Sequence, residues 1–288
     1  MNLLGQEDFI TLNNCRFRYR IAGEDNSETI FLLHGGRGIG DHIGEFTAYQ
    51  ALSDQYRVIA YDQRGCGRSD IAYPLTFSQY ADDLDAFRRH FCGDDDKIIL
   101  QGGSFGGMIA LTYAVSYQQH LSHLILRGTA PSHHHEAEAI KIFKDQIAKV
   151  PSASPAMIDK LFSDQIIDDT ELRLIWLALQ PLYFENFDPD AALERTRTMH
   201  LHAETHNALF KIKEHDLRDD LPNITVPTLA FCGANDWICP PSQTDLIADL
   251  CPNAESWHVP DANHSCHQEK NALVVEHIRN FLKRGAPC

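Results

Sequence analysis

The sequence lacks several features that would place it among membrane, secreted or nucleic-acid-binding proteins. It contains no run of about 18 apolar residues, so no membrane-spanning helix is expected. The opening residues, MNLLGQEDFITLNN, lack a basic segment followed by a long apolar run, so no secretory signal is expected. Basic residues are few, because 25 Lys and Arg stand against 40 Asp and Glu, a net charge of −15. This balance argues against binding to nucleic acid or to anionic membranes.

Cysteine pairs and nucleotide-binding glycine motifs are also missing. The 8 cysteines have no framework spacing, and none forms a C-x-x-C pair, which argues against a zinc site and a disulfide framework. In a chain without a leader they indicate reduced thiols and a cytoplasmic protein. Neither G-x-G-x-x-G nor a P-loop pattern occurs. We therefore expect no cofactor and no metal, and a small molecule or short peptide as partner; the sequence leaves the oligomeric state open.

What the chain does contain is an alternation of short apolar runs and amphipathic segments. A hairpin is predicted over residues 9–22, around two asparagines. Continuous apolar runs predict strands at 29–33, 57–61, 97–101, 123–126, 228–232 and 255–259. Helical patterns cover 46–52, 80–91, 108–115 and 273–282. Strands without polar alternation, separated by helices, predict an α/β fold with a mostly parallel sheet buried on both faces.

One long segment interrupts this alternation. Residues 132–220 are polar, helical in pattern and interrupted by prolines. We expect them to form a helical cap, or lid, inserted into a core made of residues 1–131 and 221–288.

A candidate nucleophile lies directly after the predicted core strand at 97–101. Gly102, Ser104 and Gly106 fit the pattern G-x-S-x-G, which follows a predicted strand and opens a predicted helix. Such a tight turn closes only with small neighbours, and it presents the serine hydroxyl at the edge of the sheet. Ser104 is therefore predicted to be the nucleophile.

A nucleophilic serine needs a base, and the base needs an acid that orients it. In this architecture the order along the chain is serine, acid, histidine. Asp236 follows a late strand and is preferred to Asp261, which shares a loop with the base. His264 follows the last strand and is preferred to His258 and His267.

An oxyanion formed at the substrate carbonyl needs two backbone N–H donors. One is expected from Phe105, directly after the nucleophile. The other is expected from the glycine loop after the first core strand, with Gly36 preferred to Gly35.

Three motifs together resemble those of the proline iminopeptidases, a serine branch of the α/β-hydrolase fold. They are the HGG-x-G loop at 34–38, the DQRG-x-G-x-S stretch at 62–69 and the elbow at 102–107. The resemblance covers about residues 25–130 and 215–284. It implies cofactor-free hydrolysis of an N-terminal residue from a peptide or amide by Ser104, His264 and Asp236.

Of three candidate substrate-binding residues, two depart from the pattern of that family. Arg37 replaces a proline that is usual in the glycine loop, and Trp237 follows Asp236 where some members carry an acidic residue. Glu204 lies close to where a family glutamate that binds the substrate amine would fall. Trp237 suggests an apolar wall beside the triad, so the alternative function is a carboxylesterase or lactonase with no aminopeptidase activity. A non-catalytic ligand receptor on the same fold is a third hypothesis.

Two further groups of residues are interpreted as structural. His202 and His206 are four residues apart but do not form the H-E-x-x-H zinc motif, so a polar face of the cap is the preferred interpretation. Cys66, Cys239 and Cys266 lie near the predicted catalytic loops, but none occupies an elbow. We expect these thiols to be small packing residues.

Overall fold

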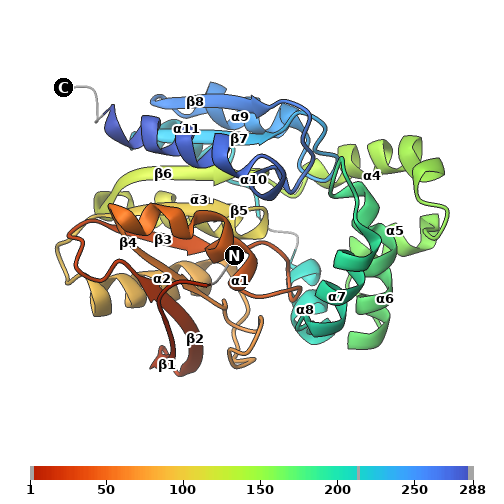
Figure 1. The fold of residues 1–288 in the computed structure, drawn as a ribbon, viewed down its shortest axis with the longest axis horizontal. Helices are drawn as coiled ribbons and strands as arrows, with labels where there is room; N and C mark the ends of the chain where they lie inside the picture. Colours follow the sequence, from red (N-terminus) through yellow and green to blue (C-terminus); the bar gives the residue numbers. More distant parts are fainter. Residues whose placement is uncertain (1–2, 213–214, 285–288) are drawn as a thin grey trace.

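A single twisted sheet forms the centre of the molecule in the computed structural model, which describes residues 3–212 and 215–284 (Figure 1). Its strands within those residues are β1 (Gln6–Leu12), β2 (Cys15–Ala22), β3 (Thr29–Leu33), β4 (Arg57–Tyr61), β5 (Ile98–Gly103), β6 (Leu121–Arg127), β7 (Thr228–Gly233) and β8 (Ala254–Val259). Their order across the sheet is β1-β2-β4-β3-β5-β6-β7-β8. From β4 onwards in this order all neighbours are parallel, whereas β1, β2 and β4 pair antiparallel. The α/β-hydrolase fold expected from the sequence is thus confirmed.

The apolar runs form the most deeply buried strands. Every residue of β3, β5 and β7 is buried, as continuous hydrophobic patterning predicts for strands covered on both faces. The predicted hairpin is also present, because Asn13 and Asn14 adopt positive φ angles of 45° and 56° and join β1 to β2. Since parallel strands end at the same edge, the loops after β3, β5, β7 and β8 meet there.

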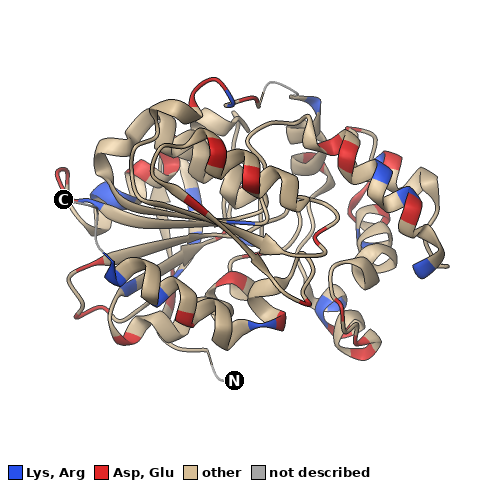
Figure 2. Cartoon of the chain, turned by 90° about the horizontal axis from the view of Figure 1, so that it is seen from above, with Lys and Arg blue, Asp and Glu red and all other residues tan. Residues whose placement is uncertain are grey.

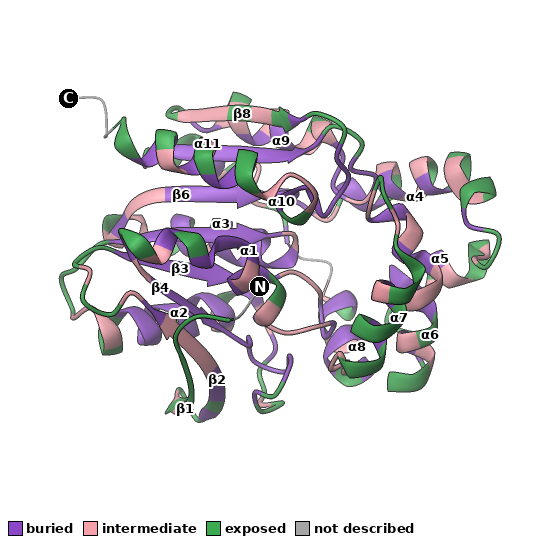
Figure 3. Ribbon diagram, in the orientation of Figure 1, coloured by how far each residue is buried: buried purple, intermediate pink, exposed green. Residues whose placement is uncertain are grey.

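Helices cover both faces of the sheet (Figures 1 and 3). They are α1 (Ile43–Tyr49), α2 (Phe77–Phe91), α3 (Phe105–Tyr117), α9 (Pro241–Leu250), α10 (Cys266–Glu269) and α11 (Asn271–Lys283). One apolar cluster packs α2 and α3 against the sheet, and a second packs α1 and α11 against the opposite face. The helix expected over 46–52 begins earlier, at Ile43, and after Tyr49 the chain tightens into a 3₁₀ turn.

Five further helices lie between β6 and β7, beyond the carboxyl ends of the strands (Figure 1). They are α4 (His135–Gln146), α5 (Pro155–Leu161), α6 (Asp169–Leu179), α7 (Pro189–Thr198) and α8 (Ala203–Lys211). Of these, α4, α5, α6 and α8 share an apolar cluster that includes Phe143, Leu172 and Leu179. We propose that residues 132–220 act as the expected cap over a core of residues 1–131 and 221–288.

Charged residues are concentrated on the helices and loops, whereas the central strands carry few (Figure 2). Within residues 3–212 and 215–284, no helix has both the length and the apolar character that crossing a membrane requires.

Candidate active site

Ser104 occupies a strained turn between β5 and α3. Its φ of 53° and ψ of −118° lie in a region that non-glycine residues rarely adopt. The flanking glycines allow the turn to close: a Cβ on Gly102 would lie 2.3 Å from the carbonyl oxygen of Gly106, and one on Gly106 would lie 2.2 Å from that of Leu33. The Ser104 amide donates to the Arg127 carbonyl at 2.8 Å. This is the elbow geometry that the glycine spacing predicts.

His264 and Asp236 meet at the same edge of the sheet. The Nδ1 atom of His264 lies 2.8 Å from the Oδ2 atom of Asp236, and both side chains are buried. The other carboxylate oxygen of Asp236 accepts hydrogen bonds from the backbone amides of Ile238 at 3.1 Å and Cys239 at 3.0 Å. These bonds fix the carboxylate, which in turn orients the imidazole ring.

The alternative residues do not share this geometry. His258 points out of β8 and pairs with Asp245 at 3.0 Å. His267 is buried in α10, with its Nε2 atom 3.5 Å from Glu45. Asp261 is exposed and lies in a turn at a φ of 49°. Neither histidine pairs with Asp236 as His264 does.

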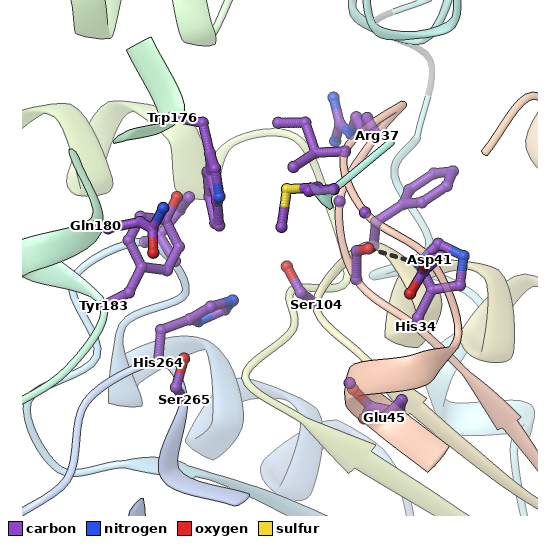
Figure 4. Close-up of a pocket in the computed structure, with 18 of the residues that line it drawn as sticks. His34, Arg37, Asp41, Glu45, Ser104, Trp176, Gln180, Tyr183, His264 and Ser265 are labelled. Carbon is purple, nitrogen blue, oxygen red and sulfur yellow. Dashed lines mark hydrogen bonds between the residues drawn. The ribbon is translucent and has the colours of Figure 1, made fainter. Parts of the chain in front are cut away.

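Ser104 and His264 both line a cavity of about 620 Å³ between the sheet edge and the helices of the 132–220 segment. The imidazole of His264 points toward Ser104 across the floor of this cavity (Figure 4). A volume of this size is typical of a small-molecule site.

A buried ion pair supports the loop that carries His264. Arg127, at the end of β6, donates from Nη1 to the carbonyl oxygen of His264 at 3.0 Å. Its Nη2 atom lies 3.1 Å from Glu45, whose carboxylate also accepts from Gln101 at 2.9 Å. Arg127 therefore links the base, the elbow and α1.

The glycine loop after β3 lies directly against the nucleophile. A Cβ on Gly35 would lie 2.9 Å from the Cβ of Ser104, and Gly36 adopts a φ of 89°. Within the described residues, the backbone amides of Gly36 and Phe105 donate no hydrogen bond to another protein group. Both amides are thus available as donors, which fits the role predicted for them.

The DQRG stretch holds this loop in place. Asp62 is fully buried and accepts from the His42 ring at 2.6 Å and from the Arg68 amide at 2.8 Å. Burial raises the pKa of Asp62, but the His42 hydrogen bond and charge outweigh it and lower that pKa to about 2. Gln63 donates to the carbonyl oxygen of His34 at 2.7 Å, so the motif anchors the end of β3.

The three thiols near the site are buried and protonated at neutral pH. Burial raises the pKa of Cys66 and of Cys266 to about 12, and it raises that of Cys239 well above the ordinary value of a thiol. Thiols in this state are poor nucleophiles. They pack as small apolar residues, as expected.

Two of the three expected substrate-binding residues lie outside the cavity. Glu204 is exposed on α8 and accepts a hydrogen bond from Tyr73 at 3.0 Å. Trp237 is fully buried behind Tyr183, at a ring-centroid distance of 5.6 Å, and is not among the cavity-lining residues. The apolar wall that Trp237 was expected to form is built instead from cap residues, including Trp176 and Tyr183. Only Arg37 lines the cavity as predicted.

The cap residues that line the cavity were not identified from the sequence. They include Leu161, Phe162, Trp176, Tyr183, Phe184, Arg195 and Phe210. Helical periodicity marks their segments as helices but does not specify which helical face turns toward Ser104.

The histidine pair of the cap makes structural contacts. A ring nitrogen of His202 lies 2.8 Å from the Gly67 carbonyl, and one of His206 lies 3.3 Å from the Arg37 carbonyl. Over the part of the chain that the structure describes, no three His, Cys, Asp or Glu side chains are grouped so that they could hold a metal ion.

Comparisons with known proteins agree with this architecture. Residues 28–270 match the family model described as the alpha/beta hydrolase fold. The chain is 45% identical to proline iminopeptidase PfmaB of Pestalotiopsis fici, over 96% of this chain and 99% of that protein. It is 29% identical to a proline iminopeptidase of Saccharolobus solfataricus, over 92% and 87% of the two chains. A thermophilic esterase from Thermogutta terrifontis superposes with a TM-score of 0.71 at 24% identity, over 98% and 100% of the chains.

Proposed function

Because this chain belongs to the α/β-hydrolase family, on its proline iminopeptidase-like branch, we propose that it is a serine hydrolase that uses Ser104, His264 and Asp236. The observation that carries the proposal is the convergence of the four loops after β3, β5, β7 and β8. The strained serine, the buried Asp236–His264 pair and the free amides of Gly36 and Phe105 all meet at one cavity.

The proposed reaction begins with proton transfer from the Ser104 hydroxyl to Nε2 of His264. The serine oxygen attacks the substrate carbonyl, and the amides of Gly36 and Phe105 stabilise the resulting oxyanion. Asp236 stabilises the charged imidazole through Nδ1. His264 then donates its proton to the leaving group, which departs and leaves an acyl-enzyme. Water activated by His264 hydrolyses the acyl-enzyme and regenerates Ser104.

The bond cleaved is an amide or an ester of a small substrate. The relatives' names favour an N-terminal amide, whereas the cavity favours the alternative, an ester or lactone. A free substrate amine needs an unpaired carboxylate, and Glu204 is hydrogen-bonded to Tyr73 and does not line the cavity. Of the carboxylates that line the cavity, Glu45 is paired with Arg127 and Asp41 lies 3.6 Å from Arg18.

A paired initial-rate assay distinguishes these substrates. One arm uses aminoacyl anilides with a free N-terminus, with proline first, and the other uses p-nitrophenyl esters and a small panel of lactones. Turnover of esters or lactones without anilides is the expected result. Turnover of prolyl anilides that is lost in Glu204→Gln would instead establish aminopeptidase activity.

The Ser104→Ala variant is the control in both arms. Its turnover should fall by at least about 10⁴-fold, while its thermal unfolding stays cooperative. Activity retained in the purified variant would contradict the assignment of Ser104.

A further inference from the structure

The side chains that line the cavity carry more positive than negative charge, whereas the whole chain is negatively charged. Five arginines line the cavity against two carboxylates, although the whole chain has a net charge of −15. The arginines are Arg18, Arg37, Arg68, Arg127 and Arg195, and the carboxylates are Asp41 and Glu45. Arg127 and Arg18 pair with those carboxylates, which leaves three lining arginines without a carboxylate partner in the lining. One of the three, Arg37, forms an ion pair with Glu136, which lies outside the lining.

Arg37 is the most deeply placed of these three. Its side chain is only 9% exposed, and its Nη2 atom donates to the sulfur of Met108, a weak acceptor, at 3.4 Å. Its Nη1 atom forms a buried ion pair with Glu136 at 3.7 Å, a distance beyond that of a hydrogen bond. Within the described residues, Nε and Nη1 of Arg37 make no hydrogen bond. A guanidinium with two nitrogen atoms that make no hydrogen bond at a cavity wall is suited to bind a carboxylate.

The surroundings of Arg37 strengthen its attraction for an anion. Its guanidinium lies 4.2 Å above the ring of Phe210, and His206 packs on the same ring. Burial lowers the pKa of Arg37, and burial together with the charge of Arg37 lowers the pKa of His206 to about 4, so the imidazole is neutral. In such a water-poor setting a charge pair is stronger than at the protein surface.

The position of Arg37 indicates which part of the substrate it would contact. Met108 lies one helical turn after Ser104 on α3, so the guanidinium that contacts it is close to the nucleophile. Tyr183 packs against the ring of His264 at 5.5 Å. Trp176 and Tyr183 lie on the same side as His264, and Arg37 lies on the other side of Ser104 (Figure 4).

These positions indicate where the leaving group and the acyl group of the substrate would lie. The leaving group must lie within reach of the proton on His264, and therefore on the side of Tyr183 and Trp176. The acyl group then extends toward Arg37. We propose that the substrate is an ester whose acyl part carries a carboxylate bound by Arg37 and whose leaving group is aromatic. This specificity rests on the proposed serine hydrolase function.

Two matched esters test the proposal. The 4-nitrophenyl ester of glutarate carries a terminal carboxylate, and the 4-nitrophenyl ester of glutaramic acid carries a neutral amide of the same shape. After subtraction of the rate with Ser104→Ala, kcat/KM should be about 10- to 100-fold higher for the carboxylate ester. Equal values, or a preference for the amide ester, would overturn the proposal while leaving the serine hydrolase function intact.

Substitution of Arg37 tests whether this residue causes the preference for the carboxylate ester. Arg37→Gln should bring the ratio of kcat/KM between the carboxylate ester and the amide ester close to one, whereas Arg37→Lys should retain part of the preference. Arg195→Gln is the matched control, because Arg195 is a second cavity arginine that contacts Gln180 on the aromatic side. If Arg195→Gln rather than Arg37→Gln removes the preference, the assignment is wrong.

A binding measurement on the unaltered enzyme is independent of both turnover and variant folding. Calorimetry compares 4-phenylbutyrate with 4-phenylbutyramide, which differ in the anionic group alone. The carboxylate should bind at least about tenfold more tightly, and the difference should shrink as salt is raised. Equal dissociation constants would contradict a carboxylate site even if esters were cleaved. If binding differs as predicted but no ester is cleaved, the proposed reaction fails and the anion site stands.

Discussion

At the scale of single residues, the backbone of Ser104 illustrates how reactivity and stability oppose each other. A φ of 53° with a ψ of −118° costs on the order of 1–3 kcal/mol for a residue with a side chain. The surrounding hydrogen bonds hold it there, since the Ser104 carbonyl accepts from the Thr129 hydroxyl at 2.7 Å. This backbone conformation places the Ser104 hydroxyl on the floor of the cavity and not within the helix that follows.

A comparison of Ser104→Ala with Ser104→Gly should separate the effect of backbone strain on stability from the loss of the nucleophile. Both Ser104→Ala and Ser104→Gly remove the hydroxyl and should abolish turnover. Glycine tolerates this conformation, so Ser104→Gly should be about 1 kcal/mol more stable than Ser104→Ala after the entropy cost of glycine. Urea denaturation of both variants measures the difference. An alanine variant that equals or exceeds the glycine variant in stability would show that the turn is not strained.

At the scale of elements, β6 is tied to the catalytic loops by the Arg127–Glu45 pair. Both side chains are about 4% exposed, so each charge depends on the other. A Cβ on Gly103 would lie 2.0 Å from Nη2 of Arg127, which explains why the residue before the nucleophile is glycine. Through its bond to the His264 carbonyl, Arg127 is a positioning residue for the base.

Removing Arg127 should therefore affect both stability and the placement of His264. Arg127→Met leaves Glu45 buried without its charge partner and should lower the free energy of unfolding by about 3–5 kcal/mol. The double variant Arg127→Met, Glu45→Gln should recover part of that loss, because no buried charge is left alone. Urea titrations of the single and double variants test this coupling. Additive losses would contradict the paired arrangement.

The elements that the sequence predicts well are those whose pattern is local. The strands at 29–33 and 57–61 match their apolar runs, because burial on both faces leaves a continuous signal. Ser104 follows from glycine spacing, since only that spacing closes the turn. Trp237 and Glu204 could not be placed in this way. Their orientation depends on how the cap helices pack, and packing against distant residues leaves no periodic trace in the sequence.

At the scale of the whole molecule, several histidines are buried in uncharged form around Arg37. Burial, together with the nearby charge of Arg37, lowers the pKa of His135 and of His206 to about 4 and that of His215 to about 3. The unfolded chain binds protons at these histidines at a higher pH than the folded chain does. Their contribution to stability is therefore fully present above about pH 6.5 and is lost as pH falls toward 4.

The free energy of unfolding should consequently decrease on mild acidification. For one histidine with the shift of His206, the loss between pH 7 and pH 5 is about 2 kcal/mol. Urea titrations at these two pH values measure it, and His206→Asn should reduce the difference by about that amount. An unchanged difference in the variant would show that His206 is not buried in neutral form.

The account depends most on Ser104 being the activated nucleophile. A fluorophosphonate probe followed by peptide mass spectrometry tests this directly, because the probe reacts with a serine that an adjacent histidine activates. We predict one adduct on the peptide that contains Ser104, with labelling strongly reduced in His264→Ala and absent in Ser104→Ala. No adduct on the folded protein, or equal labelling of the His264→Ala variant, would contradict the proposed mechanism.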